Sequence, residues 1–464
     1  MSIDKKGMSA FASGLVWFGA AVSIAEIEAG TAIAPAFQGR AGDPGPLWAL
    51  LLGHLLGGAL LFLAALLGAR MRRSAMDCVK EPFGRVGGGF FATMNLLQLV
   101  GWTAVMVAQG AGAAGELLGG RVPFGILCAT IGALVAIWIY IGLRGVGRIN
   151  SVAMGLLFAT TVVLFAAILR AGGASGAATA PAPMEGPVFW FVFEMSVAMP
   201  LSWLPLAADY TKDARRPVAA CAAAAGVYTA VSCWMYGIGI VAARFGSVSA
   251  AFQQLGSAGL GAAALVVIVF STVTTTFLDA YSAGESARSL WRKIPAKPFG
   301  VAVCALGTLL AARGVMDRYL DFLYLIASVF APMAAVLLVT QRARGDVSRG
   351  VRGGRGEDGA GDTPPSQRGV AQSAGGCISR GVRGRRGVCG GAVWNLAAWA
   401  VGFAAYHVCL GADSPLVAAF PGAFGFLAGC SSPCGATLPS MAIAAILAAP
   451  PALLHPHRRA ASSL

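Results

Sequence analysis

The sequence predicts an all-α polytopic membrane protein with twelve transmembrane helices, and three observations support this. Of 464 residues, 57% are hydrophobic and only 12% are charged, which is too little polar surface to coat a soluble globule of this size. Long apolar stretches recur along the chain, and a helix needs about 20 mostly apolar residues to cross the hydrocarbon core. The basic residues gather in alternate loops, which is the pattern of inserted membrane proteins.

The apolar stretches give the expected helices in chain order. They lie near 10–36, 47–69, 88–118, 122–143, 149–169, 187–208, 217–243, 259–281, 298–312, 319–340, 392–411 and 438–453. A further short apolar stretch, Pro415 to Cys430, is interpreted as a re-entrant or interfacial segment, because a thirteenth span would reverse the side of the C-terminus.

The distribution of Lys and Arg orients these spans. With a cytoplasmic N-terminus, the inside loops hold 28 of these residues and the outside loops hold six. This bias predicts cytoplasmic N- and C-termini and a location in the cell's inner or plasma membrane. The net charge of +14 is therefore a topology signal. A nucleic-acid partner is not expected, because the basic residues are dispersed among the spans.

Composition divides the chain into three parts. Residues 1–340 form a predicted core of ten helices, and residues 391–464 supply two trailing transmembrane helices. Between them, residues 341–390 are rich in Gly, Arg and Ser, and a segment of this kind cannot bury enough apolar surface to order itself. We therefore expect a disordered cytoplasmic linker there.

The first apolar stretch carries acids at mid-membrane depth. Gly19 to Thr31 contains small residues, Ser23, and the carboxylates Glu26 and Glu28. A carboxylate at this depth is costly unless it faces a cavity or a partner, so it marks a candidate path for a substrate, ion or proton. The glycine-rich backbone also permits a break that frees amides and carbonyls for a ligand.

The sixth stretch repeats this combination. Glu194 precedes Pro200 and Pro205, and proline removes a backbone donor and clashes with the preceding turn, so a kinked or unwound helix is expected. The two interrupted stretches are five spans apart. This is the relation expected of two inverted repeats of five helices.

The third and eighth stretches each carry a polar face. Asn95, Gln98, Trp102, Met106 and Gln109 share one face of the third, as either a packing seam or a cavity wall for a planar polar molecule, and Trp102 favours the cavity. In the eighth, Thr272, Thr275 and Thr276 share a face with Asp279. Helical threonines often bond back to their own carbonyls, but a cluster of oxygen donors also suits a small hard cation.

Three runs resemble a known family. Trp17 to Glu28, Ser202 to Thr211 and Thr272 to Gly284 closely resemble the nucleobase:cation symporter (purine/cytosine permease) family, and within it the CytX-like branch of hydroxymethylpyrimidine transporters. The resemblance covers roughly residues 8–340 and, more loosely, the last two spans. It implies a LeuT-type fold, two inverted five-helix repeats plus two C-terminal helices. It also implies import by alternating access, driven by a sodium or proton gradient.

The resemblance also implies site residues. Trp102 would stack on the substrate ring, Asp279 aligns with a substrate-binding asparagine, and Trp203 would replace a tryptophan whose position holds Pro200. Met106 stands where a relative has a glutamine, so amide recognition would fall to Gln98 or Gln109. The candidate substrate-binding residues are Glu26, Gln98, Trp102, Glu194, Trp203 and Asp279, and the candidate sodium site comprises Ala21, Ile24, Thr272, Thr275 and Thr276.

Several functional alternatives stay open at this point. Carboxylates suit the exocyclic amine and protonatable ring of hydroxymethylpyrimidine, the expected substrate. Four carboxylates cannot all face one low-dielectric pocket as anions, so proton coupling, as in a proton-coupled permease of cytosine, purines or other nucleobases, is the alternative to sodium. No resident cofactor is expected. The expected partners are a small heterocycle and the lipid bilayer, and we expect a monomer.

An integral-membrane enzyme is the remote alternative. His54 is the only histidine within the first ten spans, and the ten cysteines show no paired metal-ligand spacing. Metal-dependent or nucleophilic catalysis would need such a group beside a base. The sequence therefore predicts no enzymatic activity.

Overall fold

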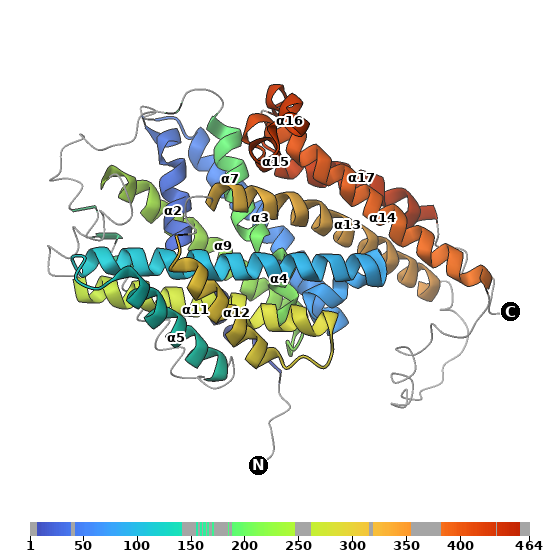
Figure 1. The fold of residues 1–464 in the computed structure, drawn as a ribbon. Helices are drawn as coiled ribbons and strands as arrows, with labels where there is room; N and C mark the ends of the chain where they lie inside the picture. The colour runs from blue at the N-terminus through green and yellow to red at the C-terminus, as the bar shows by residue number, and fades with distance from the viewer. Residues whose placement is uncertain are drawn as a thin grey trace, which may run out of the picture.

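The computed structural model of the protein describes residues 7–38, 42–141, 188–245, 261–314, 319–353, 382–432 and 434–454, with Met184 and scattered positions between 155 and 170. Helices dominate these ranges (Figure 1). In the same ranges, β pairing is limited to one bridge between Met8 and Ala214.

The helices follow the expected apolar stretches. They are α1 Ala10–Ala21, α2 Ile24–Ile33, η1 Ala34–Phe37, α3 Gly45–Met71, α4 Ala75–Leu117, α5 Phe124–Ile141, α7 Val188–Ser202, α8 Leu204–Thr211, α9 Pro217–Ala242, α11 Gly261–Leu290, α12 Ala296–Ala311, α13 Tyr319–Gly353, α14 Val382–Leu410 and α17 Thr437–Leu454. The expected fifth span, 149–169, lies largely outside the described residues.

Length and composition qualify several of these helices as membrane spans. Five described helices are long and apolar enough to cross a bilayer, or up to seven if each of two bent pairs is one span. Three shorter apolar helices, Phe124–Tyr140, Ala296–Ala311 and Thr437–Ala449, coincide with further expected spans. Most of the expected apolar stretches are thus helical where the structure describes them.

The first bent pair is α1 and α2, which meet at 56°. Ser23 has extended backbone angles and caps α2, its side chain accepting from the Glu26 backbone N–H at 3.3 Å. Serine is a preferred N-cap residue, and serine followed three residues later by glutamate is a sequence pattern typical of a helix start. The sequence therefore contains a helix N-terminus in the middle of a continuous apolar stretch.

The second bent pair is α7 and α8, which meet at 41° around Trp203. Pro205 occupies the first turn of α8. Proline has no N–H to give to the preceding turn and fits a helix start, so it ends one helix and begins the next. Both interruptions expected from the sequence are present.

The remaining helices surround these two pairs. α4 lies along α11 and α12, α3 packs against α7, α8 and α9, and α9 packs against α1 and α2. Near its start, α4 is kinked at Gly84, whose φ of +70° and ψ of −172° are open to glycine. α13, α14 and α17 form a group at one side of the molecule (Figure 1).

The short apolar stretch near residues 415–430 contributes no full span. It forms α15 Pro415–Ala419, α16 Pro421–Phe424 and η7 Gly425–Gly429, all too short to cross a hydrocarbon core. Phe420 and Phe426 are 60% and 72% exposed. Side chains of this kind on short helices suit an interfacial position.

The expected linker is described only at its ends. α13 continues to Gly353 and α14 begins at Val382, so both ends of the predicted disordered segment 341–390 are helical. Its centre, residues 354–381, lies outside the described residues. Disorder there stays a prediction from composition.

Candidate functional site

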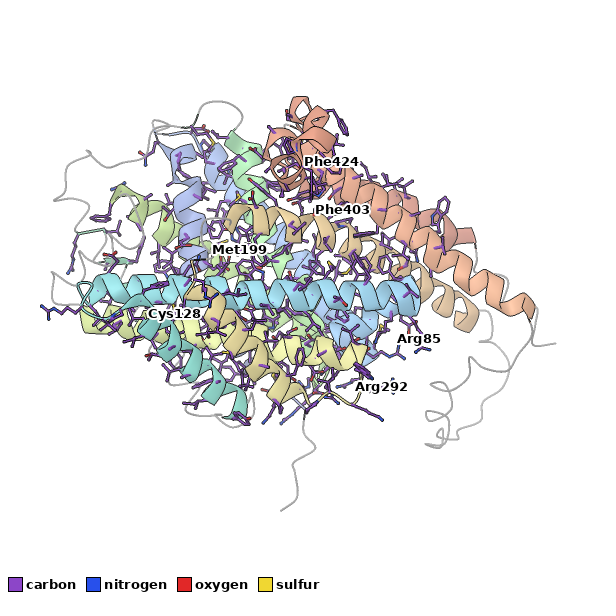
Figure 2. All side chains as sticks on the ribbon, viewed as in Figure 1. Arg85, Cys128, Met199, Arg292, Phe403 and Phe424 are labelled. Atoms are coloured by element: carbon purple, nitrogen blue, oxygen red, sulfur yellow. The ribbon has the colours of Figure 1, made fainter. Side chains whose placement is uncertain are left out.

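A central cavity opens where the two bent pairs meet α4 and α11. The empty space in it, about 370 Å³, includes space that is open to solvent. Met199, one of its lining residues, lies toward the middle of the bundle (Figure 2). The cavity is lined by Ala20, Ser23, Ala25, Glu26, Trp102, Met106, Met199, Ser202, Trp203, Leu206 and Asp279.

Two tryptophans give the cavity planar apolar walls. Trp102 comes from α4 and packs edge-on against Phe322, with ring centroids 5.8 Å apart. Trp203 comes from the α7–α8 break, packs edge-on against Trp17 at 5.5 Å, and donates its indole N–H to the Tyr228 hydroxyl at 2.8 Å. Held rings of this kind suit a flat ring as ligand.

Asp279 brings a carboxylate to the cavity from α11. The residue is 4% exposed and lines the cavity. No hydrogen-bond donor in the described part of the chain reaches its carboxylate. A buried acid facing an open volume has unused acceptor capacity, which a ligand N–H or O–H can fill.

Glu26 brings a second carboxylate from the first turn of α2, and its two oxygens are occupied. One accepts from the Tyr228 hydroxyl at 2.6 Å and the other from the Ser232 hydroxyl at 2.7 Å, both on α9. Behind Ser232, the His54 Nε2 lies 2.9 Å from the same hydroxyl, and His54 Nδ1 lies 3.0 Å from the Leu50 carbonyl oxygen. Glu26 thus connects the cavity to a buried histidine.

Two expected substrate-binding residues, Gln98 and Glu194, are not among the residues that line this cavity. Gln98 donates to the Asn95 side chain at 2.6 Å, and Asn95 donates to Ser286 at 2.7 Å, so this end of the α4 face ties α4 to α11. Glu194 accepts from the Thr437 backbone N–H at 2.6 Å. Its carboxylate is used to hold the N-terminus of α17, where a helix dipole favours an anion.

The polar face of α4 is therefore both a packing seam and a cavity wall. Its middle residues, Trp102 and Met106, line the cavity. At the far end, Gln109 donates to the Glu28 carboxylate on α2. Both readings that the sequence left open apply, each to a different part of the helix.

The candidate sodium residues lie beside the first break. The Thr275 hydroxyl donates to the Ser271 carbonyl at 2.9 Å and reaches the Gly19 carbonyl of α1 at 3.3 Å, so α11 touches the end of α1. Thr276 is buried and its hydroxyl has no partner among the described residues. A cation site on the Thr272, Thr275 and Thr276 face stays a prediction from the sequence. The Ala21 carbonyl instead accepts from the Ser23 N–H at 3.0 Å, and Ile24 begins α2.

Sequence reasoning missed the groups on α9. Tyr228, Ser232 and Tyr236 are spaced four residues apart on an apolar helix and are all buried. The same face test that found the α4 residues would have found them. His54 was noticed only as an isolated histidine, because its link to Glu26 spans 178 residues to Ser232.

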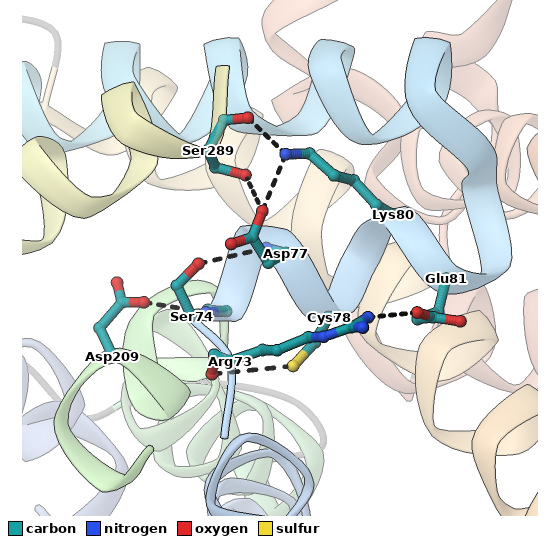
Figure 3. Close-up of polar contacts among 9 residues, drawn as sticks. Arg73, Ser74, Asp77, Cys78, Lys80, Glu81, Asp209 and Ser289 are labelled. Atoms are coloured by element: carbon teal, nitrogen blue, oxygen red, sulfur yellow. Dashed lines mark hydrogen bonds and ion pairs between the residues drawn. The ribbon is translucent and has the colours of Figure 1, made fainter. Parts of the chain in front are cut away.

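A polar cluster lies around the start of α4 (Figure 3). Asp209 of α8 accepts from the Ala75 N–H at the start of α4 at 2.8 Å and from Ser282 of α11. Lys80 reaches both Asp77, at 2.8 Å, and the Ser289 carbonyl. Nearby, Lys212 pairs with Glu285. These contacts join the ends of α4, α8 and α11.

The segment before α1 is tied to the chain just after α8. The Met8 N–H donates to the Asp213 carbonyl and the Arg215 N–H donates to the Met8 carbonyl, both at 3.0 Å. The Arg215 side chain also donates to the Gly7 carbonyl. The outer ends of the two bent pairs are thereby connected.

Comparison with solved structures identifies the fold. The chain is similar to Mhp1, a nucleobase-cation-symport-1 family transporter, in a closed conformation with bromovinylhydantoin bound: the TM-score is 0.64 and the identity 17%, covering 96% of this chain and 92% of Mhp1. The inward-facing conformation of Mhp1 matches with a TM-score of 0.63 at 17% identity, covering 98% and 92%. No protein-family model and no curated protein sequence matches the chain.

This similarity establishes the architecture. The chain is an all-helical, multi-pass membrane protein with the LeuT-type fold of Mhp1 over nearly its whole length, as the sequence predicted. The structures it resembles are transporters and not enzymes. At this level of identity the likeness concerns the fold, so substrate and ion have to be argued from the cavity.

Proposed function

We propose that the protein is a secondary active transporter that imports a pyrimidine-type heterocycle, with hydroxymethylpyrimidine as the expected substrate, by cation-coupled alternating access. One observation carries the proposal. A single cavity, bounded by both bent helix pairs, is lined by two tryptophans and two carboxylates. In transporters, substrate sites form where interrupted helices meet near the membrane midplane.

The lining chemistry supports a flat, donor-rich substrate. Trp102 and Trp203 offer rings for a planar heterocycle, and Glu26 and Asp279 offer only acceptors when ionised. Among the described lining residues none is basic, so an anionic substrate would have no counter-charge. An aminopyrimidine, with an exocyclic amine and a ring nitrogen that can take a proton, matches both features.

The nearest alternative is a nucleobase such as cytosine or a purine. Cytosine shares the flat ring and the exocyclic amine, so its recognition would use the same two carboxylates. Mhp1 was solved with bromovinylhydantoin bound, and a hydantoin ring carries no exocyclic amine. Comparing the affinities for these three classes of heterocycle therefore tests whether the carboxylates recognise the exocyclic amine.

Two ions are candidates for the coupled cation. Sodium is supported by the unpartnered Thr276 hydroxyl and by the contact of Thr275 with the end of α1. A proton is supported by the two cavity carboxylates. A sodium series at fixed pH and a pH series without sodium, each with substrate binding as the readout, separate the two.

The function is tested with the purified protein. We expect hydroxymethylpyrimidine to raise the melting temperature more than cytosine or hydantoin at equal concentration, because binding to the folded state stabilises it. In proteoliposomes, uptake of the same compound should require an imposed cation gradient. A protein that binds none of these heterocycles, or that equilibrates them without any gradient, contradicts the proposal.

A further inference from the structure

The hydrogen bonds around Ser232 fix the number of protons in a small buried group. Its hydroxyl lies 2.7 Å from a Glu26 carboxyl oxygen and 2.9 Å from His54 Nε2. It has one hydrogen and can donate to only one of the two. The other neighbour must then donate to Ser232, and a donor needs a proton of its own.

The other ring nitrogen of His54 limits the protonation states that His54 and Glu26 can adopt. Its Nδ1 lies 3.0 Å from the Leu50 carbonyl oxygen, which can only accept, so Nδ1 carries a hydrogen. If Nε2 is bare, Ser232 donates to it and Glu26 must be a protonated acid that donates to Ser232. If Nε2 is protonated, His54 is an imidazolium that donates to Ser232, and Ser232 donates to the Glu26 carboxylate.

Both arrangements hold one proton more than a carboxylate beside a neutral imidazole. The arrangement without that proton turns two lone pairs toward each other across one of the three short contacts, which is unfavourable in a buried site. The charges around Glu26 also indicate that the group holds this extra proton. Among the described residues no lysine or arginine forms an ion pair with Glu26, so the proton is what neutralises it.

We propose that Glu26, Ser232 and His54 form a proton relay that holds one proton, exchanges it with the cavity only through Glu26, and uses it as the ion coupled to substrate movement. This rests on the transport function proposed above. His54 and Ser232 are both 0% exposed and do not line the cavity, whereas Glu26 does. The Glu26 carboxyl group is therefore the member of the relay that exchanges protons with the cavity.

The transfer balances without any other reactant. The Glu26 O–H bond breaks as its hydrogen passes to the Ser232 oxygen, and the hydrogen that Ser232 held passes to His54 Nε2. A neutral acid and a neutral imidazole become a carboxylate and an imidazolium, with no change in total charge. The carboxylate can then accept an N–H from a heterocycle in the cavity, because each of its oxygens has a second lone pair.

Other ionisable groups face the relay from neighbouring helices. Tyr228 of α9 donates to Glu26, and the Tyr236 ring lies edge-on to His54 with centroids 4.6 Å apart. Cys233 of α9 also lies in the electrostatic field of Glu26. Glu28 of α2 is bonded to Gln109 of α4, and Asp279 of α11 lines the same cavity. The two acids make an unprotonated relay less favourable still.

The relay gives a defined dependence of binding on pH. If substrate binds the relay with its proton, raising the pH removes that proton and weakens binding, by about tenfold per pH unit once the relay is deprotonated. By the same linkage, substrate binding takes up protons in that range, approaching one per protein. Sodium at fixed pH should change the affinity little.

The first test needs no substrate. Infrared difference spectra of the purified protein at neutral pH, wild type against Glu26→Gln, should show that Glu26 contributes a protonated carboxyl band or that His54 is an imidazolium. An ionised Glu26 beside a neutral His54 overturns the relay. The result does not depend on what the protein transports.

The second test uses hydroxymethylpyrimidine as the probe. Calorimetry in buffers of different ionisation enthalpy measures proton uptake on binding. We expect uptake in the wild type and its loss in Glu26→Gln and Ser232→Ala, with Ser232→Thr, which keeps the hydroxyl, restoring it. His54→Gln should flatten the pH profile.

His407 supplies a matched control. It lies on α14, is 1% exposed, is bonded to Ser414 at 2.9 Å, and lies outside the cavity lining. His407→Gln should leave both the pH profile and proton uptake unchanged. Substrate binding that is independent of pH but strengthened by sodium would contradict the relay and leave the transport proposal intact. If the wild type binds none of the heterocycles tested, the transport proposal is contradicted. The infrared result would still decide whether the proton is held.

Discussion

At the scale of single residues, the two cavity acids differ in how many partners they already have. Glu26 is bonded to Tyr228 and Ser232, while the carboxylate of Asp279 meets no donor from the described part of the chain. Asp279 therefore has more acceptor capacity left for a ligand. This makes Asp279 the stronger candidate for direct recognition of an amine.

Replacing Asp279 should alter what the cavity prefers. Asp279→Asn exchanges an acceptor-only group for one that also donates, and a hydrogen bond to a charged group contributes about 1.5–3 kcal/mol. We expect at least a tenfold loss of affinity for hydroxymethylpyrimidine, measured by calorimetry. Equal affinities for the wild type and the variant would remove Asp279 from the recognition of the amine.

Trp102 should act mainly through its ring. Trp102→Ala removes an aromatic face worth about 0.5–1.5 kcal/mol beyond the apolar area that it buries, so binding should weaken by more than tenfold. Trp102→Phe, which retains a ring, should retain most of the affinity. Unchanged uptake affinity of the alanine variant in proteoliposomes would contradict ring stacking at this position.

At the scale of helices, the cap at Ser23 should stabilise the first break. Ser23→Ala removes the side-chain acceptor for the Glu26 N–H, and loss of an N-cap costs about 0.5–2 kcal/mol. We expect a lower melting temperature together with weaker substrate binding, because the cap positions a cavity acid. Ser9→Ala removes the cap of α1 at 3.1 Å from the Ala12 N–H, away from the cavity, so it should lower stability alone.

We expect Glu194 to stabilise the N-terminus of α17 and not to bind substrate. It bonds the Thr437 N–H at the start of α17, so Glu194→Gln should lower thermal stability and leave substrate affinity within about twofold, since helix-end charges contribute roughly 0.3–1 kcal/mol. A large loss of affinity without loss of stability would restore Glu194 to the substrate site.

Much of the helix arrangement follows from the sequence, and particular residues show why. Prolines and small residues predicted both interruptions, because their effect on the backbone is local. The N-cap residue Ser23, followed three residues later by Glu26, would have placed the first break to the residue. The sequence predicted less well which of the buried polar residues line the cavity. Gln98 bonds Asn95 on its own helix and Glu194 bonds the start of α17, and neither lines the cavity. The partner of Glu194 is far away in the chain and cannot be identified from local spacing.

At the scale of the whole molecule, the basic residues and the fold suggest one orientation. Arg85 and Arg292, both assigned to inside loops, lie toward the same side of the molecule in Figure 2. Single cysteines introduced at Arg85 and Arg121 into a cysteine-free background should react with a membrane-impermeant reagent from opposite sides of intact cells, Arg121 from outside. Labelling of both from one side would contradict a membrane span between them, at residues 88–118.

The segment between α13 and α14 should tolerate replacement. Residues 354–381 are rich in Gly and Arg, and a segment of this composition adds little to a packed core. Exchange for a shorter Gly/Ser segment that keeps three arginines should preserve uptake in proteoliposomes. Lost uptake with normal membrane expression would indicate a regulatory or structural role.

The backbone tie at Met8 has a consequence for the balance between conformations. Met8 shares two hydrogen bonds with Asp213 and Arg215, and bonds of this kind contribute about 0.5–1.5 kcal/mol each, so together they favour the tied state by roughly thirtyfold. Any conformation that separates the outer ends of α1 and α8 must give up that preference. If transport proceeds by alternating access as proposed, the residues ahead of the first helix would favour the conformations that keep this tie. Shortening the chain past Met8 should then redistribute the conformations without changing the binding site.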